Sequence, residues 1–102
     1  MRANPGNMAN MMRKMQKMQK EMKAAQAALE VKEYTQTSAD DLVKVTMTGQ
    51  HRLTDVTIDP KVIDPDDPDM LQDLLIETIN QVLSDVDEDT EKTMGQYTRG
   101  LM

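Results

Sequence analysis

Apolar residues near the start of the chain are spaced alternately three and four positions apart. This spacing places them on one face of an α-helix and is typical of the a and d positions of a coiled coil. We refer to these residues as the methionine seam: Met8, Met11, Met15, Met18, Met22, Ala25 and Leu29. The charged Lys32 occupies the next seam position, so the pattern predicts one long helix that ends near this residue.

The methionine seam is longer than the surface that one small sheet can offer it. A helix of roughly 24 residues is about 36 Å long at 1.5 Å per residue. The chain has 102 residues, eleven methionines, two tyrosines and no Phe or Trp. Because methionine fills irregular space but specifies packing poorly, a small methionine-rich domain gains stability from association. We therefore expect a homodimer in which much of the seam packs against a second copy.

The face of this helix opposite the seam carries positive charge. We refer to these residues as the basic stripe: Arg13, Lys14, Lys17, Lys20 and Lys23. Basic residues opposite an apolar seam are often only solubilising, but a solvated helix face usually mixes both signs in i, i+4 pairs. The only acids of this helix are Glu21 and Glu30. The imbalance favours an anionic partner, and a seam of mostly Met and Ala, without Trp or Phe, argues against a membrane surface.

Charge is distributed unevenly along the chain. Residues 1–32 hold seven basic and two acidic residues, whereas residues 33–102 hold five basic and sixteen acidic ones. The formal net charge of −6 argues against a general nucleic-acid binder, whose surface is usually basic. The asymmetry instead indicates a basic arm with an anionic partner, or two ends that attract each other in the fold.

The middle of the chain has the pattern of three short β-strands. Residues 30–37 mix β-branched residues with charges, and residues 42–48 alternate apolar and polar side chains as a half-solvated antiparallel strand does. Gly49-Gln50 fits a two-residue type II′ turn with Gly first. A third strand, residues 54–58, ends at Asp59-Pro60 because Pro cannot donate to the ladder. The expected apolar face of this hairpin is formed by Val43, Val45, Met47, Thr54, Val56 and Ile58.

A second helix is predicted after the strands. Asp67-Pro68-Asp69 supplies a capping Asp and a Pro whose missing N–H costs nothing at a helix start. The acidic residues 85–91 are expected to add an acidic turn or two with the character of a solvated helix face, and Gly95 to mark a fraying end. The apolar face of this helix should cover the hairpin, and it consists of Leu71, Leu74, Leu75, Thr78, Ile79, Val82, Leu83 and Val86.

These elements predict an α+β chain with a long N-terminal helix, a three-stranded antiparallel sheet and a C-terminal helix. We expect residues 1–102 to form a single domain whose ends, residues 1–7 and 98–102, are frayed. No stretch reaches the roughly 18 uninterrupted apolar residues of a membrane span, and the first residues lack an apolar secretory segment. We therefore expect a soluble, cytoplasmic protein with no membrane partner.

Residues that could carry catalysis or bind a metal are poorly placed in the sequence. The chain has no cysteine, His51 has the setting of an ordinary turn-flanking histidine, and neither Ser38 nor Ser84 has nucleophile-elbow glycines. Glycine-rich phosphate loops are absent. Residues 85–96 fail as a calcium loop because Thr90 and Gln96 replace its Gly and bidentate Glu. We expect no enzyme, no catalytic or metal site, no cofactor and no small-molecule substrate.

Three segments of the sequence resemble the YbaB/EbfC family of bacterial nucleoid-associated DNA-binding proteins. They are the Met- and Gln-rich residues 10–19, the hairpin residues 42–51 and the return through residues 56–60. The most specific part is the spacing from Val43-x-Val45 to Gly49 and on to Val56-x-Ile58-Asp59-Pro60. The similarity extends over roughly residues 7–100.

The resemblance implies an α+β homodimer whose paired helices project like tweezers, a role in binding DNA and organising the nucleoid, and no catalysis. The chain departs from many relatives at residues 38–41, where a Gly-rich turn is common, and in the acidity of residues 85–91. Because acids would weaken phosphate attraction, we carry over as DNA contacts only the basic stripe: Arg13, Lys14, Lys17, Lys20 and Lys23.

Two functions of different classes follow from these observations. The first is a nucleoid-associated protein that binds duplex DNA through phosphate contacts with low sequence specificity, alters its conformation and influences gene expression. Low specificity is expected because no Asn or Arg stands in a recognisable base-reading motif. The alternative is a dimeric scaffold whose basic helix docks an acidic protein partner.

Overall fold

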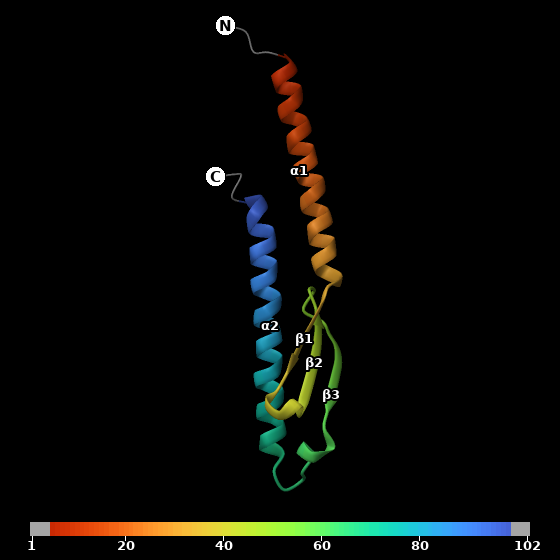
Figure 1. The fold of residues 1–102 in the computed structure, drawn as a ribbon, viewed down its shortest axis with the longest axis vertical. Coiled ribbons are helices and arrows are strands. Elements are labelled where there is room, and N and C mark those ends of the chain that lie inside the picture. Colours follow the sequence, from red (N-terminus) through yellow and green to blue (C-terminus); the bar gives the residue numbers. More distant parts are fainter. Residues whose placement is uncertain (1–4, 99–102) are drawn as a thin grey trace.

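The computed structural model describes residues 5–98, which form two long helices and one antiparallel sheet (Figure 1). The strands lie in the order β1-β2-β3. This confirms the α+β class and the order of elements predicted from the sequence. In chain order the elements are α1 (Pro5–Val31), β1 (Glu33–Thr37), η1 (Ala39–Asp41), β2 (Val43–Thr48), β3 (Leu53–Ile58), η2 (Pro60–Val62) and α2 (Pro68–Thr98).

The two helices run antiparallel, and the molecule is long and thin (Figure 1). Its extents are 81 × 21 × 16 Å and its radius of gyration is 21.5 Å. A compact domain of this size would have a radius of gyration of about 13 Å. The difference arises because the N-terminal half of α1 extends past the end of α2, away from the sheet (Figure 1).

The core lies where α2 crosses β1 and β2. Its buried side chains are Tyr34, Val43, Val45, Met47, Val82 and Val86, with Leu71, Leu74, Leu75, Ile79 and Leu83 packed around them. The expected apolar face of α2 therefore does cover the strands. Burying these aliphatic side chains stabilises the fold by about 1.5–3 kcal/mol for each one that is fully removed from water.

The third strand, β3, differs from the prediction in its register and in the exposure of its apolar side chains. Val56 pairs with Val45, and Ile58 pairs with Val43, so the apolar face does continue across the sheet. An irregularity in the ladder places Leu53, and not Thr54, opposite Met47. Leu53 and Val56 remain 45% and 42% exposed. The reason is that α2 lies over β1 and β2 and leaves β3 uncovered.

Several element boundaries also differ from those expected. The first strand begins at Glu33 and not at residue 30, because Glu30 and Val31 belong to the last turn of α1. Residues 5–7 are helical where fraying was expected, whereas residues 1–4 and 99–102 lie outside the described part. Gly95 lies inside α2, which continues to Thr98. The predicted start of α2 is confirmed: the Asp67 carboxylate accepts a hydrogen bond from Met70 N at 3.4 Å.

The turn between β2 and β3 is not the predicted type II′ turn. Thr48 exchanges hydrogen bonds with His51 N and Arg52 O at 3.0 and 2.8 Å, and His51 has φ 64°. This is the geometry of a three-residue loop that ends in a left-handed residue. Gly49 is needed for another reason: a Cβ there would lie 1.7 Å from the carbonyl oxygen of Leu29. The loop therefore packs directly on the end of α1.

Candidate nucleic-acid interface

The basic stripe lies on the exposed surface of α1. Its side chains are all exposed, and no acidic residue stands in the first helical turn. Within the part of the chain that the structure describes, the ion pairs are Lys32–Asp89 and His51–Asp87. The charges of Arg13, Lys14, Lys17, Lys20 and Lys23 are thus not neutralised by any described carboxylate.

The methionine seam is divided between two environments. Leu29 is buried, and Met18, Met22 and Ala25 are partly buried on the half of α1 that runs beside α2. Met8, Met11 and Met15 are between 58% and 64% exposed on the projecting half. A hollow of about 190 Å³ on α1 is lined by Met15, Met18, Gln19 and Met22. Among the described residues, the seam is at least partly buried from Met18 to Leu29 and exposed from Met8 to Met15.

The acidic residues 85–91 belong to α2, but this stretch is not simply a solvated helix face. Asp85 faces the sheet and accepts a hydrogen bond from Gln36 Nε2 at 2.5 Å. Asp87 lies 2.8 Å from His51 Nε2 at the hairpin loop. Several of these acids therefore bind other elements of the chain, because α2 continues past the sheet toward α1.

Asp89 on α2 contacts β1 and the residue that connects α1 to β1. Its carboxylate accepts hydrogen bonds from the Tyr34 hydroxyl at 2.5 Å and from Lys32 Nζ at 2.7 Å, and Lys32 Nζ also lies 5.2 Å from the centre of the Tyr34 ring. We refer to Lys32, Tyr34 and Asp89 as the Asp89 clamp. Hydrogen bonds from Lys32 and Tyr34 lower the pKa of Asp89. Burial, reinforced by Asp89, raises the pKa of Tyr34 to about 12, so this phenol is a hydrogen-bond donor at neutral pH.

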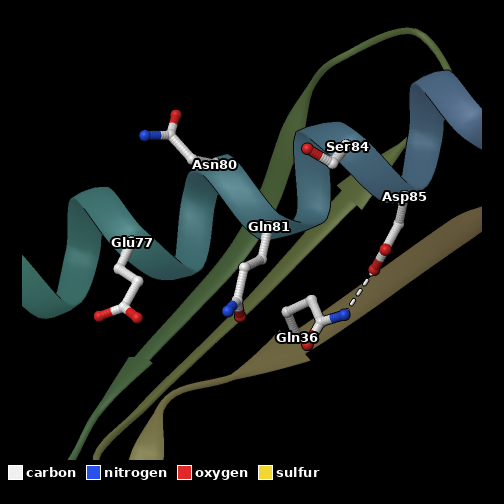
Figure 2. Close-up of a pocket in the computed structure, with 6 residues that line it drawn as sticks. All are labelled: Gln36, Glu77, Asn80, Gln81, Ser84 and Asp85. Atoms are coloured by element: carbon white, nitrogen blue, oxygen red, sulfur yellow. Dashed lines mark hydrogen bonds between the residues drawn. The ribbon is translucent and has the colours of Figure 1, made fainter.

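An open polar hollow lies beside β1 (Figure 2). Figure 2 shows Gln36 reaching from β1 toward Asp85 on α2, whereas Asn80 points away from the sheet. The hollow is lined by Gln36, Glu77, Asn80, Gln81, Ser84 and Asp85. His51 is not among the residues that line this hollow; it lies at the hairpin loop, where it contacts Asp87. No cluster of His, Cys, Asp or Glu among the described residues has the arrangement of a metal site.

Neither helix in the described range is long and apolar enough to cross a membrane.

Comparisons with known proteins agree with this architecture. The model of the YbaB/EbfC DNA-binding family matches residues 4–101, and the chain belongs to this family. It is similar to a nucleoid-associated protein of Pediococcus pentosaceus, with 52% identity covering 99% of this chain and 97% of the relative. A nucleoid-associated protein of Lactobacillus helveticus is 54% identical over 72% of this chain and 67% of its own length.

The fold is shared with a solved structure of low sequence identity. Protein HP0035 from Helicobacter pylori superposes with a TM-score of 0.63 at 23% identity. The match covers 76% of this chain and 90% of that one.

Sequence reasoning located the exposed cations but missed the contacts that involve Asp85 and Asp89. A signal for them was present. Asp85 and Asp89 are four residues apart and share one face of a helix, while Tyr34 and Gln36 are two apart and share one face of a strand. In the structure α2 lies over β1, so that Asp89 contacts Tyr34 and Asp85 contacts Gln36.

Proposed function

We propose that the protein binds duplex DNA as a homodimer, with the α1 helices presenting the basic stripe to phosphates. Binding has low sequence specificity, alters the conformation of the DNA, helps to organise the nucleoid and influences gene expression. The site of action is the cytoplasm, at the nucleoid. Membership of the YbaB/EbfC DNA-binding family supports this proposal.

The observation that carries the proposal is the segregation of charge between the helices. In α2, two of the acids toward the end of α1 are engaged: Asp89 with Lys32 and Tyr34, and Asp87 with His51. Beyond Glu91, the described part of α2 contains Lys92 and no acid. Since the helices are antiparallel, no acid of α2 lies beside the projecting half of α1. The positive potential of the basic stripe is therefore not cancelled locally, although the whole chain is acidic.

Low specificity follows from the chemistry of the stripe. Four of its five residues are lysines, whose ammonium groups act as compact point charges on flexible stems. Such groups suit phosphate oxygens, and phosphate contacts carry no base information. Any preference among duplexes then comes from groove width and the ease of bending.

A second copy gives the uncovered apolar surface a partner. The surface has two parts, namely the projecting seam around Met11 and the β3 strip formed by Leu53 and Val56. Val56 lies next to Val45, which is fully buried, so the apolar core extends to an open edge. Large open apolar surfaces of this kind mark association sites.

A pair of matched variants tests the proposal. Lys14→Gln, Lys17→Gln and Lys20→Gln together remove three charges from the stripe, whereas Lys44→Gln, Arg52→Gln and Lys61→Gln remove three exposed charges elsewhere. We expect the stripe variant to lose at least about tenfold in affinity for unrelated duplexes in a gel-shift titration, because phosphate contacts dominate nonspecific binding.

The control variant should bind as the unmodified protein does. Equal losses for both variants would mean that net charge matters and the stripe does not. If unmodified protein ignores duplex DNA at low salt but binds an acidic protein partner through the stripe, the scaffold function replaces the proposed one.

A further inference from the structure

Four methionines lie next to one another on the projecting half of α1. Met8 is three and four positions from Met11 and Met12, and Met15 is four and three positions from them, so each of these pairs is adjacent on the helix surface. We refer to these four residues as the thioether patch. They are 58%, 64%, 60% and 60% exposed, in that order. Met12 belongs to neither the seam nor the basic stripe. Neither packing along the seam nor charge therefore explains why an exposed methionine stands at this position.

The rest of the chain provides an internal comparison. Met47 is 3% exposed in the core under α2, and Met70 is 45% exposed at the start of α2. Met18 and Met22 are partly buried. Thioether sulfur reacts with peroxides at a rate that depends on its access to solvent. The structure thus gathers four exposed thioethers on α1, leaves a single exposed one at Met70 and protects Met47 in the core.

We propose that the thioether patch is a site of reversible oxidation that controls the pairing of α1 helices and, through it, DNA binding. The link to DNA rests on the proposed function. In the reaction, the O–O bond of hydrogen peroxide breaks and one oxygen atom forms a bond to sulfur. The thioether loses two electrons and becomes a sulfoxide, and the other oxygen leaves as water.

The effect of a sulfoxide follows from its polarity. Met8, Met11 and Met15 occupy seam positions, where a second copy would pack. Burying a polar sulfoxide oxygen without a hydrogen-bond partner opposes this packing. We expect pairing to weaken by at least about tenfold per buried sulfoxide. A sulfoxide carries no charge, so the basic stripe itself is unchanged.

Pairing and oxidation compete for the same surface. The free chain exposes the sulfur atoms at the seam positions, and a second copy covers them. Oxidation therefore acts on free chains and keeps them apart, and reduction of the sulfoxides by methionine sulfoxide reductases returns them to the pairing state. Because Met12 lies outside the seam, it reacts in paired and free chains alike.

The experiment treats the full chain with hydrogen peroxide at low protein concentration. Peptide mass mapping reads the order of oxidation, light scattering reads the mass, and a duplex titration reads affinity. We expect sulfoxides at the patch before Met47, a shift toward monomer mass, at least about tenfold weaker DNA binding and recovery after reductase treatment.

Two variants separate the patch from other methionines. In one, all four patch residues are changed to Leu, which keeps the apolar seam and the helix propensity. The mass and DNA affinity of this variant after peroxide treatment should match those of the same variant before treatment. The control, Met70→Leu, removes a different exposed thioether and should remain sensitive.

Three results would overturn the inference: oxidation of Met47 as early as the patch, unchanged mass and affinity after the patch is oxidised, or full peroxide sensitivity of the Leu variant. If untreated protein binds no duplex, the proposed function has failed. The inference is then still decided by the order of oxidation and by the mass.

Discussion

The helices α1 and α2 are similar in length but differ in how they use their charged residues. They have 27 and 31 residues, and each has an apolar face and a charged face. In α2, acidic side chains bind β1, the hairpin loop and the end of α1. In α1, the basic stripe binds no described carboxylate. The acids of α2 thus help to hold the fold together, whereas the basic stripe of α1 is available to an external anion.

The same contrast holds for the apolar faces. That of α2 is covered by two strands, and Val82 and Val86 are fully buried. That of α1 is buried at Leu29, partly buried from Met18 to Ala25 and exposed from Met8 to Met15. A charge placed in the core under α2 and a charge placed on the projecting half of α1 should therefore have very different effects on stability.

The largest expected effect comes from a charge in the core under α2. Val82→Asp buries a carboxylate without a partner and should cost more than about 4 kcal/mol, enough to abolish cooperative melting. The matched variant Met12→Asp, on the exposed half of α1, should change the free energy of unfolding by less than about 0.5 kcal/mol. Thermal melts followed by circular dichroism measure both. Similar losses would mean that the projecting half of α1 is packed in the monomer.

A moderate effect is expected where α1 meets the hairpin loop. In Gly49→Ala the new Cβ would lie 1.7 Å from the backbone oxygen of Leu29, so the loop must move away from the helix. We expect a loss of about 1–3 kcal/mol, as for other overpacked sites. Denaturant unfolding measures it, and Gln50→Ala in the same exposed loop is the control. A neutral Gly49→Ala would show that α1 does not rest on this loop.

The Asp89 clamp should make the junction of the helices sensitive to pH. The pKa of Asp89 is lowered from its usual 3.8 in the fold. The clamp is therefore fully stabilising above about pH 4 and weakens as the pH falls through the lowered pKa. At pH 7, Asp89→Asn should cost about 1.5–3 kcal/mol, the range for a hydrogen bond to a charged group.

Unfolding curves at several pH values check this prediction for the clamp. The difference between Asp89→Asn and the unmodified protein should shrink at low pH, once Asp89 is protonated. For comparison, Glu88→Gln removes an exposed acid from the same helix and should show no such trend. A difference that stays constant down to low pH would contradict the role assigned to the Asp89 carboxylate.

The smallest effect concerns an acid that lies on neither helix. Asp40 has φ 59° in the turn before β2, a left-handed conformation that glycine adopts without strain. Asp40→Gly should stabilise the fold by less than about 1 kcal/mol, because relief of strain is partly offset by the entropy of glycine. DNA affinity should not change, although one negative charge is lost. A marked gain in affinity would show that acids far from α1 repel DNA.

Much of the fold could be predicted from periodicity alone. The seam indicated a helix that ends near Lys32, and α1 ends at Val31. The capping Asp67 and the apolar spacing after it located α2. The family resemblance, based on the hairpin spacing, was confirmed by the match over residues 4–101.

The predictions that failed concern features that depend on contacts between residues far apart in the sequence. The pattern of Val56 and Ile58 indicated a buried face, but burial depends on where α2 crosses the sheet. Gly49 suggested a turn conformation, yet its role is close packing against Leu29. The acids of α2 could be counted in the sequence, but their engagement by Lys32, Tyr34 and Gln36 needed the fold. The basic stripe as a DNA surface stays a prediction.

The salt dependence of DNA binding tests the central contrast between the helices most directly. If the two α1 helices of a dimer bring about four to eight cations to phosphates, log K against log salt should fall with a slope of about −4 to −7. Replacing Lys14, Lys17 and Lys20 with Gln should flatten this slope and leave the dimer mass unchanged. A triple variant with the slope and affinity of the unmodified protein would contradict the account and place the contact surface off α1.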